Sequence, residues 1–382
     1  MILLQHIEQI IRDYSGGLPL HHYLKNFFRT HPKLGSRDRK AINDAVYAYY
    51  RTAPFSPRDA PVFAVIQKGL AILKTQNVFL KKIIEQDASQ DENALSLSTV
   101  LARKHIPLSQ GMDEEEWLLA HMQQPDLFVR IVRNTRENLQ KLTAKGISYN
   151  LIEPAYHKTG KPIHLRLPNG SKIDQYLNPE DYVVQDLSTQ AAVWKAAAFR
   201  SEDRDIIQVW DTCAGAGGKT ILWKELFPRD KILATDIRQS ILHNLKVRSA
   251  LYHLSGIKTM IANAAANEIP INPQKPFDAV ICDVPCSGSG TWGRTPEQFY
   301  FFEEKDLKKF KALQWPIVQN ASRFLKPGGL LFYITCSVFA CENEAVIHQL
   351  QQNTSMTLLH QELINGIAHR ADSIFMAVLR KA

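Results

Sequence analysis

Two cysteines follow apolar segments that have the length and composition of buried strands. Cys286 lies in FDAVICDVPCSGSG, three residues after Asp283, and Cys336 ends the segment GGLLFYITC. In an open α/β sheet the carboxyl ends of the strands border one ligand crevice, so these three side chains are expected to meet there. A thiolate is a strong nucleophile, and a nearby carboxyl group can hold or supply a proton. The spacing therefore predicts covalent catalysis.

Such a pair of thiols suits methylation of carbon 5 of cytosine. This carbon is too electron-poor to take a methyl group directly, so a thiolate first adds to carbon 6. Asp283 would hydrogen-bond or protonate N3 of the base, and Cys286 is a candidate for helping the carbon-5 proton leave, directly or through water. The alternative for each thiol alone is a small buried hydrophobic residue. Cys282, inside the run AVIC, fits that alternative, whereas Cys213 and Cys341 are ambiguous.

A second group of candidates lies between Asp211 and Lys219. The strand IIQVW runs into DTCAGAGGKT, whose small residues let backbone N–H groups approach a ligand. The phosphate-binding loop requires a glycine where Cys213 stands, and the dinucleotide pattern requires one where Thr220 stands, so neither matches. The remaining interpretation is a turn that cradles an amino acid and a nucleoside. It favours S-adenosylmethionine over a phosphate-rich cofactor.

Asp236 ends the next apolar segment, KILATD. At this strand end a carboxylate can accept hydrogen bonds from both hydroxyls of a ribose. The alternative role is the N-cap of the helix that follows, and the two roles are compatible.

Three domains are expected along the chain. Residues 1–122 have the apolar spacing of helices. Residues 125–184 read as a strand, a helix and two strands, which predicts a small α/β module. Residues 185–382 alternate apolar strands with helix-like segments, which predicts a Rossmann-like domain with a doubly wound parallel sheet.

The net charge of +8 and the pI near 9.1 favour a polyanionic partner, although a merely soluble surface explains them as well. Arg130, Arg133 and Arg136 are candidates to face nucleic acid. The segment 21–51 mixes basic and aromatic side chains in a way that suits an RNA backbone, or a solvated helix face over an aromatic core. Its members are Lys25, Phe27, Phe28, Arg29, Lys33, Arg37, Arg39, Lys40, Tyr47 and Arg51.

The cysteine count is five, which is odd, and no pair has the spacing of a zinc site, so no metal is expected. A reducing compartment fits best. No apolar run reaches the length of a membrane span, so a cytoplasmic protein without a membrane partner is expected. We expect a monomer.

Several segments together resemble the successive motifs of the Nop/Sun RNA cytosine-5 methyltransferases. They are VQDLSTQ, DTCAGAGGKT, FDAVICDVPCSGSGTWGRTPEQF, LQWPIVQNASRFLKPGG and YITCSVFACENE. The resemblance implies that Cys336 is the nucleophile, that Cys286 is the release cysteine, and that Lys219 steadies Asp283. It also implies an S-adenosylmethionine site made by Cys213, Ala214, Gly215, Ala216, Gly217, Gly218, Lys219, Asp236, Asn263 and Asp283.

The first domain, with LGSRDRKAINDAVYAYYR, is similar to the all-helical NusB-like RNA-binding domain of the bacterial RsmB type. That type acts on 16S ribosomal RNA, which is the leading substrate expectation, with transfer RNA as the alternative. The small module is expected to be RRM-like.

The chain departs from the family pattern at three places. Ala216 replaces a proline, Asn263 replaces an aspartate, and Ala340-Cys341 replaces Pro-Glu. A looser turn and an amide in place of a carboxylate predict cofactor binding that is retained but weaker.

Two rival functions remain. A non-catalytic ribosome-assembly factor would keep the fold without the reaction, but the intact Cys336, Cys286, Asp283 and Asp236 argue against it. A DNA cytosine-5 methyltransferase uses the Pro-Cys cysteine as its nucleophile, whereas here a second thiol follows Thr335.

Overall fold

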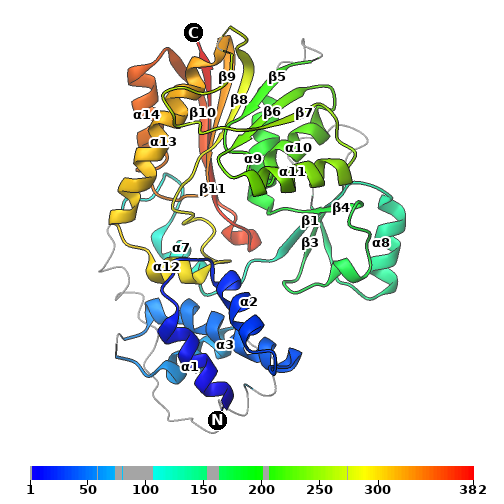
Figure 1. The fold of residues 1–382 in the computed structure, drawn as a ribbon, viewed down its shortest axis with the longest axis vertical. Helices are drawn as coiled ribbons and strands as arrows, with labels where there is room; N and C mark the ends of the chain where they lie inside the picture. Colours follow the sequence, from blue (N-terminus) through cyan, green and yellow to red (C-terminus); the bar gives the residue numbers. More distant parts are fainter. Residues whose placement is uncertain are drawn as a thin grey trace. The chain divides into compact units, whose positions relative to one another are not determined.

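The computed structural model describes residues 2–57, 59–73, 80, 106–152, 163–200, 206–272 and 274–382. These residues form two compact units (Figure 1). The first contains residues up to Ile106, Asp113–Gln124 and Thr291–Glu304, and the second contains Pro107–Met112, Pro125–Gly290 and Lys305–Ala382.

The first unit is helical, as the apolar spacing predicts. Its helices are α1 (Ile2–Asp13), α2 (Leu20–Thr30), α3 (Ser36–Thr52), α4 (Val62–Ile72), α7 (Glu114–Ala120) and α12 (Pro296–Phe301), with the 3-10 turn η1 (Ala53–Phe55). In α1, Ile7 and Ile10 lie three residues apart and face the core, where they pack with Leu24 and Val46. Residues 81–105 of the expected helical domain lie outside the described part of the chain.

A segment from the second half of the sequence completes this helical core. Phe301 of α12 packs against Tyr14 and Tyr50, with ring centroids 5.5 and 5.7 Å away. A Cβ atom on Gly16 would lie 2.8 Å from the Phe301 ring, so a larger residue does not fit there. The chain therefore leaves the larger unit after Gly290 and re-enters it at Lys305.

The expectation that Arg51 contacts RNA is wrong. Its side chain is 3% exposed, and its guanidinium group donates to the carbonyl oxygens of His121, Gln123 and Gly293 at 2.5 to 2.9 Å. Burial lowers its pKa to about 10. Arg51 thus joins three segments of the helical unit.

The second unit includes the small α/β module. It contains β1 (Leu127–Ile131), α8 (Thr135–Ala144), β2 (Asn150–Ile152), β3 (Ile163–Leu167), η2 (Ile173–Gln175) and β4 (Tyr182–Val184). The strands lie in the order β2-β3-β1-β4 and pair antiparallel. Alternate residues of β1 face opposite sides, so Val129 and Ile131 pack with Leu142 of α8.

A larger sheet follows, in the order β10-β11-β9-β8-β5-β6-β7. Its strands are β5 (Gln208–Asp211), β6 (Lys231–Asp236), β7 (Ile257–Ile261), β8 (Phe277–Asp283), β9 (Leu325–Thr335), β10 (Met356–Ile364) and β11 (Ile374–Lys381). Strands β5 to β9 are parallel, as expected. The sheet is not parallel at one edge, because β11 runs antiparallel to β9 and to β10. The connection between β10 and β11 is too short for the crossover that parallel neighbours need, so these two strands run antiparallel.

Helices cover both faces of this sheet (Figure 1). Helices α9 (Leu187–Ala198) and α10 (Gly218–Leu226) pack on the face that carries Val209 and Phe332. Helices α13 (Lys305–Arg323) and α14 (Glu344–Asn353) pack on the face that carries Trp210 and Cys282. Helix α11 (Gln239–Leu251) follows β6.

None of the helices in the described ranges is long and apolar enough to cross a membrane. Within the same ranges no group of three or more His, Cys, Asp or Glu residues is arranged to hold a metal ion.

Arg130 does not face nucleic acid either. Its side chain is fully buried and donates from Nε and Nη2 to the carboxylate of Glu225 in α10, at 3.0 and 2.9 Å, and from Nη1 to Gln185. Arg133 is partly buried and donates to the carbonyl oxygen of Tyr252, whereas Arg136 is exposed. The Arg130–Glu225 pair fixes the small sheet against the larger domain within this unit.

We predict that Arg130→Ala lowers the free energy of unfolding by about 3 to 5 kcal/mol, because the Glu225 carboxylate is then buried without its cation. Arg133→Ala is the matched control and should cost no more than about 1 kcal/mol, since that side chain is a third exposed. Urea titrations of both variants measure the difference. Equal losses would contradict the structural role of Arg130.

Candidate active site

The candidate residues lie at the carboxyl ends of the parallel strands. The strand order reverses at β5, with β6 and β7 on one side and β8 and β9 on the other. Such a reversal leaves a crevice at the strand ends. Asp211 ends β5, Asp236 ends β6, Asp283 ends β8, and Cys336 follows β9.

Lys219 and Asp283 form an ion pair in this crevice. Lys219 is the second residue of α10, and its Nζ atom donates to Oδ2 of Asp283 at 2.6 Å. Burial lowers the pKa of Lys219, but Asp283, Cys336 and Asp211 together raise it above its usual value. The lysine therefore remains a cation although only 8% of it is exposed.

The loops that carry the two thiols lie side by side. Interaction with Cys336, followed by burial and by the charge of Glu342, raises the pKa of Cys286 well above its usual value. A raised pKa favours the protonated thiol at neutral pH. Nearby, the N–H group of Gly290 donates to the carbonyl oxygen of Cys336 at 2.9 Å, which joins the two loops.

Glu342 is a site residue that the sequence reasoning missed. It is fully buried, and its carboxylate accepts hydrogen bonds from the N–H and hydroxyl groups of Ser287 at 2.9 and 2.6 Å. It also accepts from the hydroxyl group of Ser337 at 2.6 Å and the amide of Gln314 at 3.1 Å. Ser287 directly follows Cys286, and Ser337 directly follows Cys336. A serine after each cysteine was therefore the sequence feature that could have indicated a shared polar partner.

The loop Cys213–Gly218 follows β5 and wraps toward the end of β6. The N–H group of Ala214 donates to the carbonyl oxygen of Thr235 at 2.8 Å, and that of Gly215 donates to Oδ2 of Asp236 at 3.1 Å. Gly217 has φ +84°, and a Cβ atom there would lie 2.1 Å from Leu245. The loop therefore requires glycine at this position.

Asp236 is not an N-cap residue. Helix α11 begins at Gln239 and the residue that precedes it is Arg238, whose N–H, Nε and Nη2 groups all donate to the Asp236 carboxylate at 2.9 to 3.0 Å. Burial raises the pKa of Asp236, but the bonds from Arg238 and Gly215 outweigh burial and lower it. The Arg238 side chain is 59% exposed, so it can swing away and release this carboxylate.

Asn263 and Asp211 complete this end of the sheet. Asn263 is exposed after β7, and its Oδ1 accepts from the N–H group of Ala265 at 3.0 Å. Asp211 is buried, and its Oδ2 accepts from the hydroxyl group of Thr220 at 2.5 Å. Its Oδ1 has no hydrogen-bond partner among the described residues. The sequence reasoning used Asp211 only to mark the start of the loop.

The remaining cysteines differ in their surroundings. Cys282 is fully buried in the core, as expected, and burial raises its pKa well above the usual value. Cys213 and Cys341 are partly exposed, and all five cysteines are free thiols. Burial raises the pKa of Cys213 as well, so this loop thiol is protonated at neutral pH.

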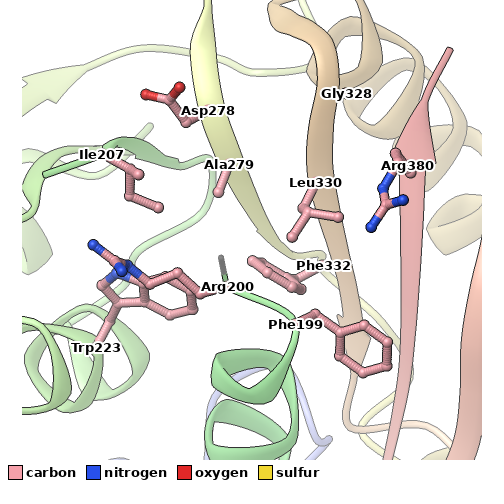
Figure 2. A pocket seen from close by; sticks show the side chains of 10 residues that line it. All are labelled: Phe199, Arg200, Ile207, Trp223, Asp278, Ala279, Gly328, Leu330, Phe332 and Arg380. Atoms are coloured by element: carbon pink, nitrogen blue, oxygen red, sulfur yellow. The ribbon is translucent and has the colours of Figure 1, made fainter. Parts of the chain in front are cut away.

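A hollow of about 400 Å³ lies at the opposite end of the same strands (Figure 2). It is lined by Ile207 before β5, by Asp278 and Ala279 at the start of β8, and by Gly328 and Leu330 in the first half of β9. These positions are at the amino ends of the strands, so this hollow is separate from the site of the thiols.

Known proteins resemble this chain in sequence and in fold. Residues 196–376 match the model of a family described as 16S rRNA methyltransferase RsmB/F. Ribosomal RNA small subunit methyltransferase B of Erwinia tasmaniensis is 30% identical over 246 residues, which are 63% of this chain and 54% of that protein. The chain spans about half of the length of such relatives, between 46% and 60% in three of them.

Two solved structures share the fold. PH0851 matches with a TM-score of 0.67 and 18% identity, over 95% of each chain. NSun6 from Pyrococcus horikoshii, solved with SFG, matches with a TM-score of 0.54 and 15% identity, over 70% of this chain and 94% of that one. These likenesses confirm the expected Rossmann-like fold.

Asp211 makes the stability of the fold depend on pH. Its pKa is raised from 3.8 to about 7, chiefly by burial. A carboxyl group whose pKa is higher in the folded than in the unfolded state stabilises the fold below the unfolded value, and this contribution is lost as the pH rises through the folded value. Asp211→Asn mimics the neutral acid. Between the unfolded and the folded pKa values, the free energy of unfolding of Asp211→Asn should rise relative to that of the wild type by about 1.4 kcal/mol for each pH unit.

Urea titrations of both proteins at about pH 5 and about pH 7 measure this gain, since both values lie within the window between the two pKa values. If the stability difference were the same at both values, Asp211 would be ionised throughout the window.

Proposed function

We propose that this protein methylates carbon 5 of a cytosine in small-subunit ribosomal RNA, because residues 196–376 match the family model described as 16S rRNA methyltransferase RsmB/F. S-adenosylmethionine supplies the electrophilic methyl group when it is bound. One observation carries the proposal: the loops that carry Cys286 and Cys336 are joined by hydrogen bonds at the carboxyl ends of β8 and β9, where Lys219 is ion-paired with Asp283. A nucleophile, a second thiol and a carboxylate for the base are the groups that this reaction requires.

Cys336 is the proposed nucleophile. Its thiolate adds to carbon 6 of the base, so a sulfur–carbon bond forms and carbon 5 becomes electron-rich. Cys336 contributes to the raised pKa of Lys219, and the ammonium group of Lys219 favours negative charge on the attacking sulfur. After methylation the carbon-5 proton leaves, the sulfur–carbon bond breaks and Cys336 is regenerated, with Cys286 assisting the release.

Asp283 is the proposed ligand of the base edge. Lys219 holds its Oδ2 atom, and no group in the described part of the chain donates to Oδ1 at hydrogen-bond distance. The Asp283 side chain is 28% exposed, so Oδ1 can meet N3 or the amino group of cytosine. The ion pair fixes the direction in which that oxygen points.

The methyl donor fits beside the loop Cys213–Gly218. Asp236 supplies a carboxylate for the ribose hydroxyls once Arg238 has moved, and Asn263 supplies an amide for the adenine. The buried Oδ1 of Asp211, which lacks a partner among the described residues, suits the ammonium group of the amino-acid part. In the same fold, the structure of NSun6 contains SFG, an analogue of S-adenosylmethionine.

The helical unit is the proposed RNA-binding part. A hollow of about 760 Å³ on its surface is lined by the cations Lys25, Arg29 and Arg39 together with Phe28 and Tyr47. The Arg39 guanidinium group lies 5.7 Å from the centre of the Phe28 ring. Cations attract phosphates, and aromatic rings stack with bases, so this surface supports an RNA partner. The proposed ribosomal substrate places the protein in the cytoplasm, where ribosomes are assembled.

The roles of the thiols predict opposite outcomes for two variants. Cys336→Ala should abolish methyl transfer, because no bond to carbon 6 forms. Cys286→Ala should accumulate a covalent protein–RNA adduct, because addition proceeds but release does not. The two variants are incubated with S-adenosylmethionine and with unmodified small-subunit ribosomal RNA or transfer RNA. Denaturing electrophoresis detects the adduct, and bisulfite sequencing locates the methylated cytosine.

An adduct with Cys336→Ala and none with Cys286→Ala would reverse the roles. Methylation of transfer RNA alone would change the substrate. If the protein bound ribosomal RNA but transferred no methyl group, it would instead be a non-catalytic assembly factor.

The ribose assignment predicts that Asp236→Ala raises the dissociation constant for S-adenosylmethionine at least about tenfold, which is the loss of about 1.4 kcal/mol. Arg238→Ala is the matched control, because it removes the residue that occupies the Asp236 carboxylate. It should leave the affinity unchanged or improve it. Titration calorimetry measures both, and an unchanged affinity with Asp236→Ala would refute the assignment.

A further inference from the structure

Glu342 lies between the two loops that carry the thiols. It follows β9, and its carboxylate receives four hydrogen bonds, two from Ser287, one from Ser337 and one from Gln314. The hydroxyl group of Tyr333 donates to its carbonyl oxygen at 2.6 Å. No part of Glu342 is exposed. A buried carboxylate with several donors is strongly held in one position.

These contacts bridge the sequence positions next to the thiols. Ser287 follows Cys286, and Ser337 follows Cys336, so one carboxylate binds both loops one residue beyond each sulfur. Gln314 reinforces the bridge, since the same amide nitrogen donates to Glu342 and to the carbonyl oxygen of Pro285. The separation of the two sulfur atoms depends on this bridge.

A carboxylate lies beside the loop that carries Cys286. Oε1 of Glu342 accepts from the N–H group of Ser287, the residue after Cys286, and the charge of Glu342 contributes to the raised pKa of Cys286. The donors to Glu342 are hydroxyl and amide groups without a charge, so its negative charge is not cancelled by an ion pair with them. A negative charge disfavours a thiolate beside it, and a positive charge favours one.

We propose that Glu342 is a positioning residue that holds the two thiol loops together and keeps Cys286 protonated during the reaction at Cys336. The proposal rests on the proposed methyl transfer and refines it. During release the carbon-5 proton passes to water, its electron pair forms the double bond between carbons 5 and 6, and the sulfur–carbon bond breaks. Cys336 departs as a thiolate, and the S–H group of Cys286 donates a hydrogen bond to that departing sulfur.

Glu342→Gln tests the charge with little change of shape, because the serine hydroxyls can turn to accept from its amide. Glu344→Gln is the matched control. Glu344 lies two residues further on, and its carboxylate accepts from Ser109 and from the N–H group of Gln110, away from the thiols. Alkylation of each protein by iodoacetamide is followed over pH, with Cys286 and Cys336 resolved by peptide mass spectrometry.

Glu342→Gln should lower the alkylation midpoint of Cys286 by about one pH unit, and the control should leave it in place. An unchanged Cys286 midpoint would overturn the proposal. This readout needs no RNA, so it is independent of whether the proposed reaction is correct.

The second readout is the release of methylated RNA in a single turnover. Release should slow as the pH rises and Cys286 loses its proton, and in Glu342→Gln this decline should begin at a lower pH by the same shift. A decline at the same pH in both proteins would exclude Cys286 as the donor. If alkylation shifts as expected but no RNA is methylated, Glu342 sets the thiol charges and the proposed function fails instead.

Discussion

The parallel pairing of β8 with β9 is the constraint on which the site depends. Asp283 pairs with Ile334, and the N–H group of Val284 donates to the carbonyl oxygen of Ile334 at 3.1 Å, so the two strands end at the same level. The loops with Cys286 and Cys336 therefore begin side by side. Residues that are 50 positions apart, such as Ser287 and Ser337, can then share a hydrogen bond.

Charge is distributed unevenly across this small volume. Lys219 is ion-paired with Asp283, and the charges of Asp211 and Cys336 also contribute to its raised pKa. Glu342 interacts with neutral donors and lies near Cys286. Cys286 and Cys336 are the same type of residue, but their neighbours in the fold differ, so the two sulfur atoms have different chemical surroundings. In the proposed mechanism this difference underlies addition by Cys336 and release by Cys286.

The strand ends were predictable because an apolar run shows where a buried strand stops, and parallel strands bring their carboxyl ends to one edge. Arg130 was not predictable, since nothing local distinguishes an arginine that faces solvent from one that meets Glu225 across 95 positions. Glu342 was missed for the same reason, because its partner Ser287 is 55 residues away. The packing of Thr291–Glu304 in the helical unit also depends on tertiary contacts that have no periodic pattern.

The most direct test of the account uses RNA in which 5-fluorocytidine replaces cytidine. Fluorine at carbon 5 cannot leave as a proton, so the wild-type protein should stop at the covalent adduct after methyl transfer. Digestion and mass spectrometry then identify the modified residue. The account predicts the nucleotide on Cys336, with Cys286 unmodified. A nucleotide on Cys286, or no adduct with an RNA that the protein otherwise methylates, would contradict it.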